Sequence, residues 1–125
     1  MLQNLLSLAR KLRGKTGCPW DRARKFKDLP PMLIEESEEI SEAIKKRDWK
    51  NLREEIGDVL YNLCMLMIMA EENGYFSAKD VIESSGKKIR ERHTWVFGKD
   101  TAKTPSDVLR LWKKNKKKEK KGSMK

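Results

Sequence analysis

Residues 33–44 read LIEESEEISEAI and residues 52–63 read LREEIGDVLYNL, and these two stretches decide the fold. In both, apolar residues recur at the three-to-four-residue spacing of one helix face, which predicts two amphipathic α-helices. The stretches also form an imperfect repeat at an offset of 19 residues, with Leu33 aligned to Leu52. The segment between them is long enough for a turn, so we expect the two helices to run antiparallel, with their repeated acidic positions facing each other.

The repeat places two pairs of carboxylates beside the apolar faces of these helices. Glu36 and Glu39 are three positions apart in the first helix, as are Glu55 and Asp58 in the second, so each pair shares one face. Four carboxylates at the edge of a core repel one another unless they are protonated or bind cations. Because hard divalent ions prefer oxygen ligands, the pattern predicts a Mg²⁺ or Mn²⁺ site. Asn62, one turn after Asp58, could orient a ligand carboxylate or contact a substrate.

An acid-rich helix can also be a solvated surface whose carboxylates pair with Lys and Arg. Glu42 and Lys46, spaced i and i+4, are such a pair. One acidic pair alone would favour that interpretation, whereas two matched pairs that border apolar stripes favour the metal site.

The rest of the chain also shows helical patterning, and no stretch sustains the alternation of apolar and polar residues that a strand requires. We therefore expect an all-α fold, an antiparallel helical bundle of four to five helices. Pro, Gly and capping residues divide the chain into predicted helices at about 2–12, 22–27, 31–47, 49–72 and 78–93, and from 105 into the C-terminal segment.

The second helix of the repeat continues into an apolar run that one small chain covers poorly. From Val59 to Ala70 the sequence is VLYNLCMLMIMA, in which 11 of 12 residues are apolar or aromatic. A helix that is apolar on every side must be covered on every side. Packing against a second copy is the simplest cover, so we expect a homodimer or a higher homo-oligomer. A central core helix within a monomer is the alternative.

Charge is distributed unevenly along the chain. The 29 Lys and Arg exceed the 19 Asp and Glu by ten, and residues 113–125 alone carry eight Lys and one Glu. That tail has almost no apolar residue, so we expect it to be disordered. The basic balance suggests an anionic partner, either a nucleotide or nucleic acid that the tail contacts weakly and without sequence preference.

Other classes of protein are excluded by what the sequence lacks. No stretch reaches the roughly 18 apolar residues of a membrane span, so we expect no membrane partner. His93 is the only histidine, which excludes a site that needs two imidazoles. Cys18 and Cys64 are too few for a disulfide framework or a thiolate metal site. With no sign of a secretory signal, free thiols in a cytoplasmic protein are the better interpretation.

The acidic pattern resembles the signature of a known family. Glu35-Glu36-x-x-Glu39, followed after 15 residues by Glu55-x-x-Asp58, is similar to the motif of the MazG-like nucleoside triphosphate pyrophosphohydrolases. Three further stretches resemble the same family, namely GCPWD at 17–21, AEENG at 70–74 and RHTWVF at 92–97. The likeness covers residues 1–98, which we take as the domain, and leaves a C-terminal helix and Lys-rich tail at 99–125.

The resemblance implies an all-α, metal-dependent enzyme that assembles from helical subunits. It would cleave nucleoside triphosphates between the α and β phosphates in a housecleaning role, releasing a monophosphate and pyrophosphate. Glu36, Glu39, Glu55 and Asp58 would bind Mg²⁺, and Glu35 would support them or help to position and deprotonate the attacking water.

Further residues would contact the substrate. Lys88 and Arg92 take the phosphate-contacting positions of the family's basic motif, and as i and i+4 residues they share a helix face. Trp20, Trp49 and Trp95 could each stack on the base, although each could instead pack in the core or at an interface. The chain departs from the family where Arg22-Ala-Arg-Lys-Phe26 replaces the usual Gln-Thr-His run, and where Glu91 interrupts a double Arg. These departures concern base specificity and leave the acidic motif intact.

Two alternatives stay open from the sequence. The first is a related all-α pyrophosphohydrolase that acts on dUTP or phosphoribosyl-ATP. The second is a non-enzymatic helical protein that binds nucleic acid non-specifically through its Lys-rich tail.

Overall fold

The computed structural model describes residues 1–123, with side chains up to residue 119, and every regular element within them is helical. The elements are α1 (Leu2–Arg13), α2 (Pro19–Ala23), the 3₁₀ helix η1 (Phe26–Asp28), α3 (Leu29–Lys46), α4 (Trp49–Glu72), α5 (Ala78–Arg92), α6 (Thr94–Phe97) and α7 (Pro105–Ser123). The predicted all-α class is confirmed. The chain divides into two compact units, of which the first is Met1–Ala78 and the second begins at Lys79.

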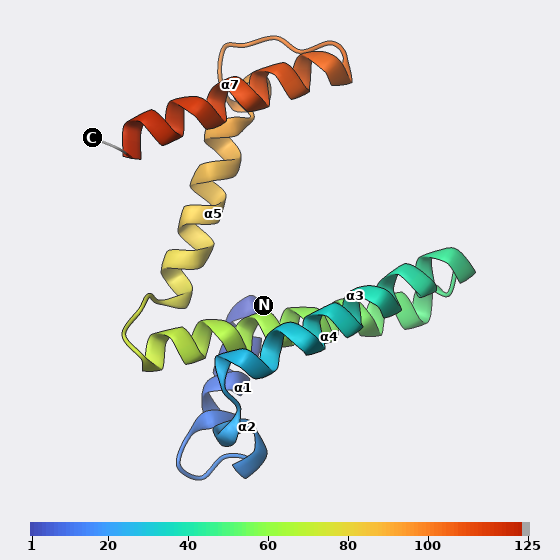
Figure 1. Cartoon of the computed structure of the whole chain (residues 1–125), viewed down its shortest axis with the longest axis vertical. Helices are drawn as coiled ribbons and strands as arrows, with labels where there is room; N and C mark the ends of the chain where they lie inside the picture. The colour runs from blue at the N-terminus through green and yellow to red at the C-terminus, as the bar shows by residue number, and fades with distance from the viewer. Residues whose placement is uncertain (124–125) are drawn as a thin grey trace. The chain divides into compact units, whose positions relative to one another are not determined.

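An antiparallel hairpin of α3 and α4 is the main feature of the first unit, as the repeat predicts (Figure 1). Pro30 and Pro31 occupy the first turn of α3, where a helix needs no backbone N–H. Arg47 ends α3 in the left-handed conformation, with φ 54°. Asp48 then caps α4 by accepting a hydrogen bond from the backbone N–H of Asn51 at 3.2 Å.

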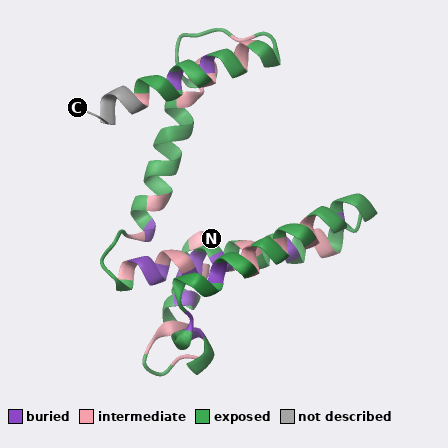
Figure 2. Ribbon diagram, viewed as in Figure 1, coloured by how far each residue is buried: buried purple, intermediate pink, exposed green. Residues whose placement is uncertain are grey.

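The core of the first unit lies where α1 packs against the C-terminal half of α4 (Figure 2). Ion pairs join the two helices at the surface, between Arg10 and Glu71 at 3.2 Å and between Arg13 and Glu72 at 2.8 Å. The buried members of this core are Leu6, Ala9, Leu29, Cys64, Met65, Ile68, Met69 and Ala78. The chain itself therefore covers the second half of the apolar run.

The first half of that run is covered less well. Leu60 is 37% exposed and Leu63 is 39% exposed, and Ile56, one turn earlier on α4, is 52% exposed. Ile34 and Ile44 on α3 are also more than half exposed. The hairpin thus carries exposed aliphatic side chains on both of its helices.

The segment between α1 and α3 differs from its prediction. A helix was expected over 22–27, but α2 ends at Ala23 and Arg24 is extended, with ψ 140°. The expected cap, Asp21, lies inside α2 with its side chain 3.6 Å from the Arg24 guanidinium. Gly17 precedes this helix at a position where a β-carbon would clash with the backbone carbonyl oxygens of Lys11 and Leu12, so glycine is required there.

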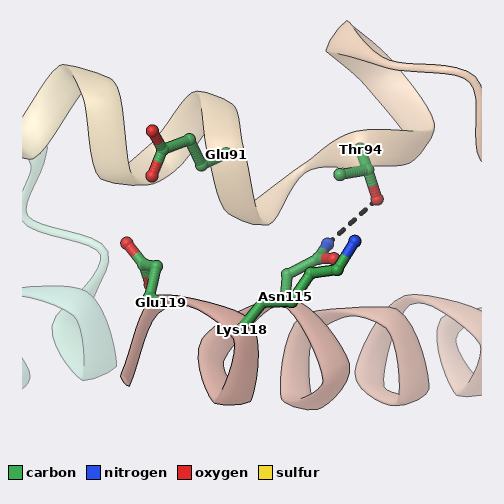
Figure 3. Close-up of a pocket in the computed structure, with 5 residues that line it drawn as sticks. All are labelled: Glu91, Thr94, Asn115, Lys118 and Glu119. Atoms are coloured by element: carbon green, nitrogen blue, oxygen red, sulfur yellow. Dashed lines mark hydrogen bonds between the residues drawn. The ribbon is translucent and has the colours of Figure 1, made fainter. Parts of the chain in front are cut away.

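The second unit contains α5, α6 and α7. Asn115 of α7 is buried, and its amide donates hydrogen bonds to the backbone carbonyl of Arg92 at 3.0 Å and to the Thr94 hydroxyl at 2.9 Å. Figure 3 shows the hydrogen bond between Asn115 and Thr94 among the residues that line a pocket. The pocket has a volume of about 380 Å³. Its lining consists of Glu91, Thr94, Asn115, Lys118 and Glu119.

The Lys-rich segment is helical where disorder was expected. α7 continues to Ser123, and residues 124 and 125 lie outside the described residues. Lys has a good intrinsic helix propensity, and the buried residues Leu111 and Asn115 anchor the preceding turns. Charge density alone therefore gave the wrong local structure. No helix within the described range has the length and hydropathy that a bilayer span requires.

Candidate active site

Three carboxylates meet between the two helices of the hairpin. Glu36 and Glu39 of α3 and Glu55 of α4 each contribute an oxygen to a group in which all these atoms lie within 4.8 Å of one another. Glu55 is buried, and the two α3 residues are half-buried. The repeat predicted this meeting, because antiparallel helices bring equivalent positions of both segments to the same level of the seam.

The close approach of the three groups disfavours the ionised forms of Glu39 and Glu55. The contact with Glu55 is the largest cause that raises the pKa of Glu39, followed by desolvation. The pKa of Glu55 is raised mainly by its contact with Glu36, and the Asp58 charge raises the pKa of both Glu39 and Glu55. A cation bound among these oxygens would offset the repulsion that their ionisation creates.

Two oxygens of the cluster lack a hydrogen-bond donor. Oε2 of Glu36 and Oε2 of Glu55 are inaccessible to solvent and accept no hydrogen bond from any residue that the structure describes. Among the described residues, no Lys or Arg forms an ion pair with the clustered carboxylates, although Glu42 does pair with Lys46 at 3.3 Å. These buried oxygens have no hydrogen-bond donor, and their carboxylates pair with no described Lys or Arg side chain. Such oxygens are suitable ligands for a hard divalent ion such as Mg²⁺ or Mn²⁺.

Asp58 and Glu35 lie outside this group of three. Asp58 is exposed one turn after Glu55, close enough for its charge to act on the cluster. Glu35 is exposed beside Glu36 on α3.

Asn62 and Trp20 are both linked to Arg24, a residue that the sequence did not single out. Asn62 is buried, and its amide oxygen accepts a hydrogen bond from the Arg24 guanidinium at 3.3 Å. The same guanidinium lies 4.7 Å from the ring centre of Trp20, which is 61% exposed. The sequence did contain one signal for Arg24. The residue lies within the stretch 22–26, which replaces the family's usual Gln-Thr-His run.

Lys88 and Arg92 belong to α5 in the second unit. Lys88 is exposed, whereas Arg92 donates a hydrogen bond to Glu119 of α7 at 2.8 Å and lies 5.1 Å from the ring centre of Trp112. Their assignment to substrate phosphates stays a prediction.

The fold and the cluster define an all-α protein with a candidate metal site on a helical hairpin. Comparison with models of protein families shows which family this protein belongs to. The model of the MazG nucleotide pyrophosphohydrolase domain matches residues 24–97, and the chain belongs to this family.

Curated and solved relatives agree with the assignment. The chain is 35% identical over 112 residues to a nucleoside triphosphate pyrophosphohydrolase of Escherichia coli strain K12, a match that covers 89% of this chain and 43% of that protein. It is 40% identical over 98 residues to the nucleoside triphosphate pyrophosphohydrolase/pyrophosphatase MazG of Thermotoga maritima, covering 78% and 38%. The chain thus spans less than half the length of these curated relatives.

A solved structure supports the same fold. The crystal structure of a mazG-related protein from Thermotoga maritima has a TM-score of 0.76 and 32% sequence identity. The match covers 92% of this chain and 98% of that one.

Proposed function

We propose that the chain hydrolyses nucleoside triphosphates between the α and β phosphates, releasing a nucleoside monophosphate and pyrophosphate. The observation that carries this proposal is the carboxylate group of Glu36, Glu39 and Glu55, with its two buried oxygens that accept no hydrogen bond within the described part of the chain. The names of the curated relatives support the same reaction class.

The residues have separable roles in this proposal. Glu36, Glu39, Glu55 and Asp58 would hold Mg²⁺ or Mn²⁺. A bound ion of this kind polarises phosphoryl oxygens and activates water. Glu35, exposed next to Glu36, would orient the attacking water and accept its proton. Lys88 and Arg92 would offset phosphate charge, as the family resemblance implies. A cytoplasmic location and weak contact of the Lys-rich helix with nucleic acid stay predictions.

Product analysis tests the reaction. Each NTP and dNTP, together with dUTP and phosphoribosyl-ATP, is incubated with the protein in Mg²⁺, in Mn²⁺ and in excess chelator, and the products are separated by anion exchange. We expect monophosphate and pyrophosphate with either ion and no turnover in chelator. Diphosphate with orthophosphate, or no turnover across the whole panel, would exclude the proposed reaction.

We also propose that the protein assembles as a homodimer or a higher homo-oligomer. The exposed aliphatic side chains on α3 and α4, including Ile34, Ile56 and Leu63, support a second copy as their cover. Light scattering on the purified chain is expected to give at least twice the chain mass of 14.7 kDa. A mass of one chain across a wide range of protein concentration would contradict this.

A further inference from the structure

Arg24 is a buried cation that neither the family motif nor the proposed reaction uses. Only 6% of the residue is exposed, and its Nε is buried with no hydrogen-bond partner among the described side chains and backbone. A buried guanidinium is costly unless neighbouring groups compensate it, so its partners reveal its role. Arg24 follows α2, and its backbone carbonyl accepts a hydrogen bond from Arg13 at 3.1 Å, which fixes the segment.

The guanidinium joins three parts of the first unit. One amino group donates to the amide oxygen of Asn62 at 3.3 Å and to the sulfur of Met32 at 2.9 Å. The other lies 3.6 Å from a carboxylate oxygen of Asp21. The guanidinium carbon, Cζ, is also 4.7 Å from the ring centre of Trp20, a distance typical of cation–π contact.

These contacts place Arg24 next to the carboxylates along the α3–α4 seam. Met32 is one turn before Glu36 on α3, and Asn62 is one turn after Asp58 on α4. Because the helices run antiparallel, both steps go in the same direction along the hairpin. The guanidinium therefore lies about one helical pitch, roughly 5.4 Å, from the level of the carboxylates.

Arg24 fixes which end of the Asn62 amide is free. A guanidinium has only donors, so the amide must turn its oxygen toward Arg24 and its NH₂ group away. Asn62 thus directs its NH₂ donors away from Arg24, while its oxygen is turned toward the guanidinium. The indole of Trp20 is held by the same guanidinium and still has most of its surface exposed.

We propose that Arg24 is a positioning residue that sets base specificity, by holding Trp20 and Asn62 as the stacking wall and the donor edge of a nucleobase subsite. The inference rests on the proposed function, because the substrate is a nucleotide. A donor edge pairs with a ring carbonyl and leaves an exocyclic amino group without an acceptor. Uracil, thymine and hypoxanthine, whose pairing edges carry oxo groups, are therefore preferred over adenine, whose edge carries an amino group.

The test compares base discrimination in the purified full chain and its variants. For ITP against ATP and for UTP against CTP, we expect wild-type kcat/KM ratios of about ten or more, and ratios near one in Arg24→Gln. Glutamine offers both a donor and an acceptor, so Asn62 is free to turn over. Arg24→Lys, which only donates, is expected to restore much of the discrimination. Arg22→Gln is the matched control, since Arg22 is exposed in the same segment.

A second variant keeps the inference testable if Arg24→Gln folds poorly. Asn62→Asp keeps an acceptor for Arg24 but lacks the donors, and we expect it to lose the preference for oxo bases. If Arg24→Gln and Asn62→Asp both keep the wild-type ratios, the inference is overturned, whatever their overall rates.

Binding of the monophosphates separates this inference from the proposed reaction. Calorimetry with IMP, AMP, UMP and CMP needs no turnover. Tighter binding of IMP and UMP, lost in Arg24→Gln, supports the subsite even if no triphosphate is hydrolysed. Hydrolysis to monophosphate and pyrophosphate with equal kcat/KM for all bases supports the reaction and rejects the subsite. If there is neither binding nor turnover, both are rejected.

Discussion

Replacing Glu55 by Gln is expected to abolish hydrolysis and, at the same time, to make the metal-free protein more stable to heat. Glu55 is buried and belongs to the group of three carboxylates, and one of its oxygens accepts no hydrogen bond from residues 1–119. Substitutions that only support a metal ligand cost about 10–100-fold in affinity or activity, so loss of the ligand itself should cost at least about 100-fold. The neutral amide removes one of the opposing charges that raise the pKa of Glu39.

Two measurements on the same samples test this pair of effects. Pyrophosphate release gives the activity, and thermal unfolding with and without Mg²⁺ gives the stability. Wild type should gain stability when the ion is added, because a ligand that binds only the folded state stabilises it, by about 2.7 kcal/mol at a concentration of 100 Kd. Glu55→Gln should begin at a higher midpoint in chelator and should gain little from Mg²⁺.

Glu54→Gln is the matched control for Glu55→Gln. Glu54 is the adjacent residue on α4, is exposed and lies outside the carboxylate group. It should keep its activity and its response to Mg²⁺. Full activity in Glu55→Gln, or a lower thermal midpoint without metal, would show that Glu55 is a structural residue and not a metal ligand.

The carboxylate group could be predicted from the sequence because two periodicities agree there. Helical spacing put Glu36 and Glu39 on one face, and the repeat with an offset of 19 residues put Glu55 opposite them in an antiparallel pair. Both arguments use only local periodicity and a short turn. The position of the Asp58 side chain could not be predicted in this way, because the rotamer of an exposed side chain depends on the charges around it.

Arg24 shows where such an argument stops. The residue lies in an extended link between α2 and η1, where apolar periodicity carries no information. The residue type also misleads there, because arginine is mostly exposed in proteins, so nothing in the sequence predicts that Arg24 is buried. The contacts that explain it reach Asn62, 38 positions away, and become visible only when α2 packs against the hairpin. For the Lys-rich segment the prediction of disorder was wrong, because it gave the net charge more weight than the helix propensity of lysine.

The second large effect is on stability, and it concerns the residue with which α3 begins. Leu29 is fully buried and belongs to the same core as Met65 of α4, which is also fully buried. Leu29→Ala removes most of a fully buried side chain and leaves a cavity in this core. Such a change typically costs about 2–5 kcal/mol. For a domain whose total stability is roughly 5–15 kcal/mol, that is a large share.

Urea unfolding followed by circular dichroism measures this cost, and Leu8→Ala is the matched control. Leu8 is the same residue type on α1 but is 55% exposed, so its truncation should change the free energy of unfolding by less than about 0.5 kcal/mol. An equal loss in the two variants would mean that α1 is covered in solution by something beyond this unit. A negligible loss in Leu29→Ala would mean that the N-terminal turn of α3 is not anchored in the core.

The start of α3 also sets the register that brings Met32 to Arg24 and Glu36 to the carboxylate group. Leu29→Ala should therefore lower the affinity for Mg²⁺ even where the chain remains folded, whereas Leu8→Ala should leave that affinity unchanged.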